Sequence, residues 1–139
     1  MKAITLWEPW ATFIAAGHKR YETRSWSTLF RGNIAIHASK RWQRDQKHIL
    51  NSLVMRHPEL ADYAVYEFPF GCVVVACRLV AVHKTEAIRD SLTPLERALG
   101  DYSTGRFAWE LEIIKLPEKP IPAQGMQGIW TWDYTGAQP

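Results

Sequence analysis

The stretch "GCVVVACRLVAVHK", residues 71–84, is the most apolar of the segments with strand character. Strands that are buried on both faces have near-continuous hydrophobic runs of this kind. We therefore predict a long strand here, at the centre of a sheet. Its two cysteines, Cys72 and Cys77, are five residues apart, so they point to opposite faces and are too far apart for a disulfide.

Shorter elements are predicted on both sides of this strand. The expected strands are 2–6, 19–25, 31–39, 71–84, 105–116 and 127–134, and the expected helices are 9–16, 40–55 (capped by Ser39) and 93–102. About five to six strands with interspersed helices indicate an α+β fold, a small β-barrel decorated by helices. The 139 residues contain no repeat and no internal linker, which predicts a single domain over 1–139.

Composition excludes several classes of protein. No apolar run approaches the roughly 18–20 residues that span a bilayer, and the start "MKAITLWEPW" lacks the features of a secretory signal. The expected location is the cytoplasm, with no membrane contact. The histidines and cysteines show no metal-ligand spacing, and no Gly-rich phosphate loop or Ser-His-Asp pattern is visible. We expect no metal and no cofactor.

Charge and tryptophan are unevenly used. Residues 1–60 carry ten Lys/Arg and four Asp/Glu, whereas the remaining residues carry seven and ten. This asymmetry favours a positively charged face, although a solvated helix face is an equal alternative. Seven tryptophans are several times the usual frequency. Exposed tryptophans stack on bases, whereas buried ones stabilise a small barrel.

The segment "GHKRYETRSWS", residues 17–27, concentrates charge on one predicted strand. Strand alternation places Arg20, Glu22 and Arg24 on one face and Lys19 on the other, together with Tyr21 and Thr23. One interpretation is structural: an edge strand whose charges discourage aggregation, or a Glu22–Arg24 pair of same-face neighbours buried against a helix. The other is a cleft in which Lys and Arg bind phosphate while Glu orients a ligand or accepts a proton.

Neighbouring segments favour the cleft. Trp7, Pro9 and Trp10 come directly before the charged strand, and Trp26 follows it. His37, Ser39 and Lys40 end another predicted strand, at an expected helix N-terminus. Free N–H groups at such an end attract anions and disfavour cations, so Lys40 there is better suited to a phosphate than to the helix. Solvent exposure of Lys40 is an equal alternative. His37 is expected to pack beside the barrel with one hydrogen bond, with general-base duty as the lesser alternative.

Two later loops offer further candidates. In "GDYSTGRFAW", residues 100–109, Arg106 is placed to bind phosphate and Tyr102 to stack on a base, with Ser103 in the same turn. A plain turn is the alternative. The amides of Gln124 and Gln127 are suited to reading a base edge, although surface solvation explains them equally well.

The spacing G-x-K-x-x-E-x-R, here Gly17, Lys19, Glu22 and Arg24, recurs with other segments in a recognisable order. The segments are "LWEPWATFIAAGHKRYETRSW", "RGNIAIHASK", "GCVVVACRLV", "GDYSTGRFAWELE" and "QGIWTWD". Together they resemble the ASCH domain family, named for homology to activating signal cointegrator 1, in the PUA-like superfamily. The resemblance spans essentially the whole chain. It implies a PUA-like barrel with a cleft for RNA or other nucleic acid, lined by Lys19, Glu22 and Arg24.

The resemblance also implies a possible activity. One bacterial branch of the family hydrolyses the acetyl amide of N4-acetylcytidine, using a Lys, a Thr three residues further on and a distant Glu. Lys19 matches that Lys and Arg24 matches the Arg that follows it in the family, but Glu22 occupies the Thr position. Thr23 is one residue off and is expected to face away from the partner of Lys19. A Lys19–Glu22 pair is nevertheless able to activate water.

Three functional hypotheses follow. The leading one is a nucleic-acid-binding module, with RNA favoured over DNA, or a nucleotide-binding one. Lys19, Arg24 and Lys40 would contact phosphate, Glu22 a base or ribose, and Trp7 or Trp10 would stack. The second is a small hydrolase of a modified nucleoside or of RNA, with Lys19 and Glu22 as the acid–base pair. The third is a protein-interaction module. A closed pocket with a lowered Lys19 pKa favours the enzyme, an open basic groove favours polymer binding, and an exposed apolar patch favours the third.

Overall fold

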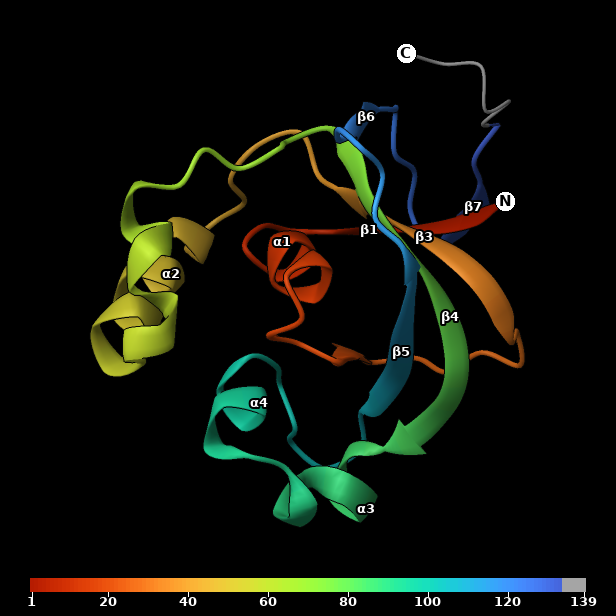
Figure 1. Cartoon of the computed structure of the whole chain (residues 1–139). Coiled ribbons are helices and arrows are strands. Elements are labelled where there is room, and N and C mark those ends of the chain that lie inside the picture. Colours follow the sequence, from red (N-terminus) through yellow and green to blue (C-terminus); the bar gives the residue numbers. More distant parts are fainter. Residues whose placement is uncertain (134–139) are drawn as a thin grey trace.

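In the computed structural model, which describes residues 1–133, the chain forms an α+β fold around one strongly curled sheet (Figure 1). The strands follow the order β2-β5-β4-β3-β1-β7, and β6 pairs separately with β4. Their bounds are β1 Lys2–Leu6, β2 Tyr21–Arg24, β3 Gly32–Ala38, β4 Cys72–Lys84, β5 Phe107–Lys115, β6 Ile121–Pro122 and β7 Ile129–Thr131. The helical segments are α1 Trp10–Ala15, α2 Gln46–Arg56, η1 Pro58–Val65, α3 Thr85–Ile88, η2 Arg89–Ser91 and α4 Pro94–Ala98. The expected barrel-like α+β fold is confirmed.

β4 is the central strand, as its apolar run predicts. It pairs antiparallel with β3 on one side and β5 on the other. Two register shifts in its pairing with β5, at Ala76/Cys77 and at Leu79/Ala81, mark irregularities of the kind that bend a sheet. Cys72 and Cys77 are both free, also as predicted.

β1 makes the sheet mixed, because it pairs parallel with β3 and antiparallel with β7. Two of its buried side chains, Ile4 and Leu6, join a core cluster with Ile34, Ile36 and Trp109. Because β1 ends at Leu6, the residues that follow it, Trp7 onward, emerge at the end of the sheet next to α1.

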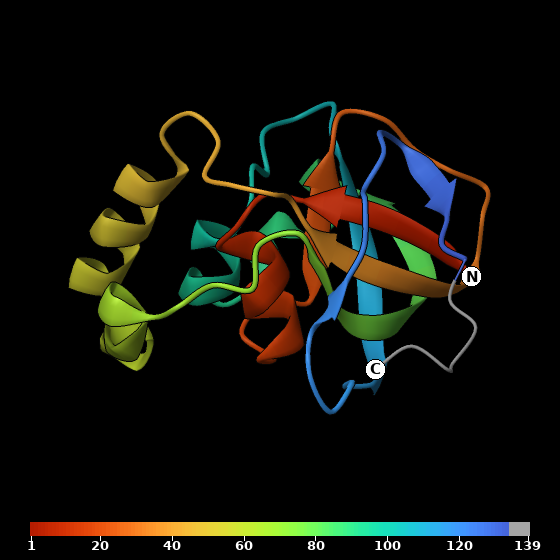
Figure 2. The same ribbon diagram turned by 90° about the horizontal axis from the view of Figure 1, so that it is seen from above.

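The short helix α1 lies between the curled sheet and the α2–η1 unit, as both ribbon views show (Figures 1 and 2). Ala11 and Ile14 pack into the core of the sheet. Phe13 packs instead into a second cluster with Leu50 and Leu53 of α2. One helix of six residues therefore connects the two apolar cores.

Local hydrogen bonds determine where α1 begins and ends. The buried carboxylate of Glu8 accepts from the backbone N–H of Thr12 at 2.8 Å and from its hydroxyl at 2.6 Å. Burial raises the pKa of Glu8 above its ordinary value, while the bonds from Thr12 act in the opposite direction. At the other end Gly17 adopts a φ of +86°, which favours glycine, and the N–H groups of His18 and Lys19 both bond to the carbonyl of Phe13.

The predicted helix over 40–55 is wrong in its first part. α2 begins only at Gln46, and Asp45 occupies its N-cap position. Ser39 caps no helix, because its hydroxyl donates to the carbonyl of Arg41. Lys40 therefore does not lie at a helix N-terminus, and the argument that placed an anion there fails.

Two other predicted elements are shorter than expected. The helix over 93–102 is reduced to α4, where the Thr93 hydroxyl accepts from the N–H of Glu96. The last strand ends at Thr131, and Tyr134, which was included in it, lies outside the described residues. Within residues 1–133, no helix has the length and hydropathy needed to cross a membrane.

Replacing Phe13 by Ala tests the connecting role of α1. We expect a loss of about 3–5 kcal/mol in the free energy of unfolding, because a fully buried ring at the junction of α1 and α2 is removed. Urea denaturation followed by circular dichroism measures it. Met55→Ala, at an exposed position on α2, is the control and should change stability by less than about 0.5 kcal/mol. A Phe13→Ala loss as small as that of the control would contradict this account.

Candidate functional site

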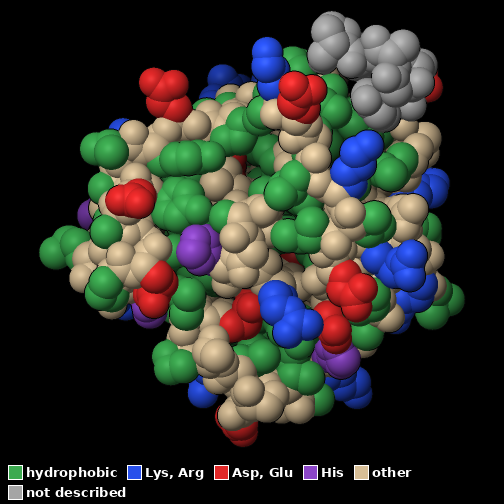
Figure 3. Space-filling model, in the orientation of Figure 1, with side chains coloured by type: hydrophobic (Ala, Val, Ile, Leu, Met, Phe, Trp, Pro, Cys, Tyr) green, Lys and Arg blue, Asp and Glu red, His purple; other side chains and the backbone are tan. Residues whose placement is uncertain are grey.

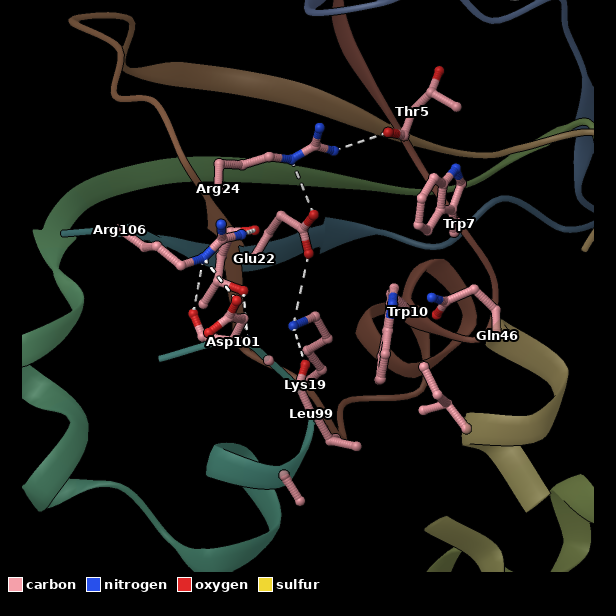
Figure 4. Close-up of a pocket in the computed structure, with 14 residues that line it drawn as sticks. Thr5, Trp7, Trp10, Lys19, Glu22, Arg24, Gln46, Leu99, Asp101 and Arg106 are labelled. Carbon is pink, nitrogen blue, oxygen red and sulfur yellow. Dashed lines mark hydrogen bonds and ion pairs between the residues drawn. The ribbon is translucent and has the colours of Figure 1, made fainter. Parts of the chain in front are cut away.

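A pocket of about 570 Å³ opens between the sheet and the helices (Figure 4). The end of β1, the start of α1, strand β2, the first turn of α2 and the loop after α4 all contribute to it. It is lined by Thr5, Trp7, Trp10, Lys19, Glu22, Thr23, Arg24, Gln46, Ile49, Ala98, Leu99, Gly100, Asp101 and Arg106. We call it the central pocket. Its volume lies within the roughly 300–1,000 Å³ that is usual for small-molecule sites.

Lys19 lies at the bottom of the central pocket and is only 3% exposed. Its Nζ donates to the carbonyl of Leu99 and is 3.7 Å from Oε1 of Glu22. It also lies 5.5 Å from the centre of the Trp10 ring, within range of a cation–π contact. Burial lowers the pKa of Lys19, and the Glu22 carboxylate opposes that shift.

Glu22 is shared between two cations. Its Oε2 is 3.0 Å from Nε of Arg24, a close ion pair that lacks the direction of a hydrogen bond. The Nη2 of Arg24 in turn donates to the carbonyl of Thr5 at 2.9 Å. Figure 4 shows the resulting chain of contacts from Leu99 to Thr5 across the floor of the pocket.

The expected separation of Lys19 and Glu22 onto opposite strand faces is therefore wrong. β2 begins at Tyr21, so Lys19 precedes the strand and does not follow its alternation. Thr23 was expected to face away from the partner of Lys19, yet it also lines the pocket, where its hydroxyl accepts from the N–H of Asp101 at 3.0 Å.

Arg106 and Asp101 form one rim of the pocket. Nε of Arg106 lies 3.4 Å from Oδ2 of Asp101 and donates to its carbonyl at 3.2 Å, while Nη2 donates to the carbonyl of Thr23 at 3.4 Å. Hydrogen bonds from Ser103 lower the pKa of Asp101, with a smaller contribution from Arg106. Gly100 packs closely here, because a Cβ would lie 3.0 Å from the Tyr102 ring and 3.1 Å from Cγ2 of Thr23, so a larger residue would require these side chains to shift.

The opposite wall is aromatic and apolar. Trp7 is 39% exposed and Trp10 is partly buried, and both face the floor in the close-up (Figure 4). Arg44 lies 6.0 Å from the centre of the Trp7 ring. Gln46 and Ile49 are three residues apart, so they share one face of α2 and both line the pocket.

The structure gathers half of the candidate residues into the central pocket. These six are Trp7, Trp10, Lys19, Glu22, Arg24 and Arg106. Pro9 occupies the N-cap position of α1 and does not line the pocket. Ser39 and Lys40 lie in the loop before α2, away from the lining.

The remaining candidates, His37, Tyr102 and Ser103, do not line the central pocket. His37 is buried, with Nε2 2.7 Å from the carbonyl of Ala123 and Nδ1 3.1 Å from the Thr5 hydroxyl. Burial lowers the pKa of His37. Tyr102 is buried, and Ser103 donates from its hydroxyl and its N–H to Asp101 Oδ1.

Sequence reasoning missed eight lining residues, of which Gln46 is the most informative. The amide candidates in the sequence were Gln124 and Gln127, but both are exposed and neither lines the central pocket, which agrees with the alternative of surface solvation. Asp101 had a local signal, because it lies in the Gly-flanked turn that was singled out for Arg106. Nothing local marked Gln46. Among residues 1–133, no cluster of three His, Cys, Asp or Glu side chains is arranged to hold a metal.

The lowered pKa of Lys19 predicts a pH dependence of stability. Between the folded-state pKa and the ordinary value of 10.5, the unfolded chain holds a proton that the folded protein has released. The free energy of unfolding should therefore rise with pH in this window for wild type relative to Lys19→Met, which has no group to titrate. Urea denaturation at several values from about pH 7 to pH 10 measures the difference. The same pH dependence of the free energy of unfolding in both proteins would contradict the burial of the ammonium.

Replacing Glu22 by Gln tests the ion pairs. Loss of the carboxylate leaves the buried ammonium without its nearest opposite charge, so we expect a loss of about 3–5 kcal/mol in the free energy of unfolding. Glu67→Gln, at an exposed position outside the pocket, is the matched control and should have almost no effect. Equal free energies of unfolding for the two variants would contradict the stabilisation of the Lys19 ammonium by Glu22.

Comparisons with known proteins bear on both the fold and the family. The chain is similar to the ASCH protein of Zymomonas mobilis, with a TM-score of 0.59, 20% identity, and coverage of 97% of this chain and 88% of that one. Two substituted forms of that protein match with TM-scores of 0.56 and 0.55, each at 19% identity, covering 96% of this chain and 90% and 88% of theirs. These likenesses support the fold. The search of curated proteins found no match. Because the ASCH domain model matches residues 4–121, most of the chain, the protein belongs to the ASCH domain family.

Proposed function

We propose that the central pocket binds one nucleotide unit of a nucleic acid, with RNA favoured over DNA. The observation that carries the proposal is that an aromatic wall, Trp7 and Trp10, faces an ion-paired floor of Lys19, Glu22 and Arg24 in one hollow. Proteins that bind single-stranded nucleic acid combine these two features, stacking platforms for bases and cations for the backbone.

The aromatic wall is suited to the base. Trp7 is the one exposed residue of the seven tryptophans, all of which lie within the described residues, and its ring borders the pocket. Stacking of a base on such a ring contributes about 1–3 kcal/mol. Glu22 accepts hydrogen bonds only, so it suits a base N–H or a ribose hydroxyl.

The phosphate is better assigned to Arg24 and Arg106 than to Lys19 or Lys40. Lys40 lies outside the pocket, and the Lys19 ammonium is buried beneath Glu22. Arg24 and Arg106 use Nε and Nη2 for their contacts, and no hydrogen bond within residues 1–133 engages the Nη1 of either. Arginine with free N–H groups is well suited to phosphate oxygens.

The surface supports one bound nucleotide more than a long tract. On the face seen in Figure 3, Lys and Arg side chains are interspersed with Asp and Glu and form no continuous basic stripe. The cleft for RNA or other nucleic acid that the family resemblance implies favours RNA over DNA as the source of that nucleotide.

Titration of labelled single-stranded RNA, duplex RNA and DNA at about 50 and 200 mM salt tests the proposal. We expect salt-sensitive binding of single-stranded RNA that Arg24→Ala weakens by roughly tenfold or more, with a salt slope that is smaller by about one. Arg56→Ala is the matched control, an exposed arginine at the end of α2 outside the pocket. Binding of none of the three nucleic acids, or equal loss in both variants, would refute nucleic-acid binding at this site.

Hydrolysis of a modified nucleoside is the second candidate, favoured by the burial of Lys19. Its lowered pKa enlarges the fraction of neutral amine, which is able to take a proton from water, and Glu22 lies 3.7 Å away. For N4-acetylcytidine, water would add to the acetyl carbonyl and the C–N bond would break. One proton of the water would pass through Lys19 to the leaving nitrogen, giving cytidine and acetic acid, which releases its proton to solvent as acetate.

Release of cytidine from N4-acetylcytidine, followed by chromatography, tests this candidate. We expect the rate to rise with pH through the lowered pKa of Lys19, because only the neutral amine acts as a base. Lys19→Met should abolish turnover, whereas Lys47→Met, exposed on α2 and outside the pocket, should leave it unchanged. Turnover that is absent from wild type, or that survives in Lys19→Met, would exclude this chemistry.

A further inference from the structure

Gln46 is the polar residue of the central pocket whose contacts remain unexplained. Its side chain is buried, with the residue 8% exposed, and Oε1 has no hydrogen-bond partner among residues 1–133. In the close-up its amide end points toward Trp10 (Figure 4). A buried amide oxygen without a partner is costly, and folded proteins rarely tolerate one.

The position of Gln46 in the pocket suits its unpaired carboxamide oxygen to hydrogen bonding with a ligand. The floor and rim of the pocket are polar, and their charges pair with one another. The wall around Gln46 is apolar, formed by Trp7, Trp10 and Ile49. A base stacked on this wall would therefore meet the carboxamide at its edge, and the oxygen of that group has no partner among residues 1–133.

We infer that Gln46 reads the edge of the bound base and restricts the site to bases that carry an N–H donor beside an acceptor. This inference rests on the proposed binding of a nucleotide in the central pocket. The carboxamide offers one acceptor, Oε1, and one donor group, Nε2, and it does so whichever way it is turned about its terminal bond. Glutamine pairs with base edges in this bidentate manner.

The alternative is that Gln46 only fills space in the first turn of α2. The two possibilities differ in the stability of the free protein. If the amide oxygen makes no hydrogen bond in the free protein, Gln46→Leu removes an unpaired buried polar group and should raise the thermal midpoint of unfolding by about 2–5 °C. If the amide has a structural partner, the midpoint should fall.

Three matched pairs of nucleotides test the inference directly. Each pair joins a natural ribonucleoside 5′-monophosphate to an analogue whose N–H donor is missing or blocked. The pairs are the adenosine and purine ribonucleotides, the cytidine and pyrimidin-2-one ribonucleotides, and the uridine and N3-methyluridine ribonucleotides. Dissociation constants come from isothermal titration with wild type, Gln46→Leu and the control Gln127→Leu, an exposed glutamine outside the pocket.

For wild type and Gln127→Leu, we expect at least one natural nucleotide to bind roughly tenfold or more tightly than its analogue. For Gln46→Leu, that ratio should fall below about threefold while stacking still holds the base. Gln46→Met, which also lacks the amide but keeps an unbranched chain, should behave in the same way and replaces the leucine variant if that one does not fold.

Three outcomes overturn the inference. The first is binding without discrimination within any pair in wild type. The second is discrimination that survives in both Gln46 variants, and the third is a lowered thermal midpoint in both. Each of these leaves nucleotide binding intact. Failure of every nucleotide and of single-stranded RNA to bind wild type refutes the proposed function itself and is therefore distinguishable from them.

Discussion

The buried ammonium group of Lys19 is the constraint around which the site is organised. A charge of this kind is stable away from water only when opposite charge and hydrogen-bond acceptors surround it. Glu22 supplies the charge at 3.7 Å, and the carbonyl of Leu99 supplies an acceptor. Glu22 then requires further compensation, which Arg24 provides while it bonds to the carbonyl of Thr5. Segments from both sides of the pocket, β1, β2 and the end of α4, are thereby tied together at one point.

The packing of α1 is what delivers Lys19 to this position. The side chain of Phe13 lies in the helical core, and its carbonyl accepts the N–H groups of His18 and Lys19. Gly17 makes this turn possible with its positive φ, and β2 begins two residues after Lys19. Hydrophobic burial on one side of Phe13 and hydrogen bonding on the other therefore set the depth of the pocket floor. A substitution in the helical core that moves Phe13 should therefore also move Lys19 in the central pocket.

The sequence predicts the features of this fold that depend on local patterns. The apolar run of β4 marks the central strand, and the charged segment after Gly17 marks the pocket floor. Predictions fail where tertiary contacts decide. Residues 40–45 have a helical pattern, yet the Trp42 ring packs on Phe68 and Phe70, with centres 5.1 and 5.2 Å apart, and α2 starts later. Gln46 carries no local signal at all, because only the folded chain brings α2 to the pocket.

The internal pairing of the floor has a consequence for recognition. Lys19, Glu22 and Arg24 hold one another before any ligand arrives, so the site is preorganised and little ordering entropy is lost on binding. The same pairing limits what these charges gain from a ligand, since their contacts already exist. Discrimination between ligands must then come from polar groups that have no hydrogen-bond partner in the free protein. An unpartnered amide in an apolar wall discriminates well between ligands. A ligand that cannot hydrogen-bond to the amide leaves its oxygen buried and unpaired in the complex, as it is in the free protein.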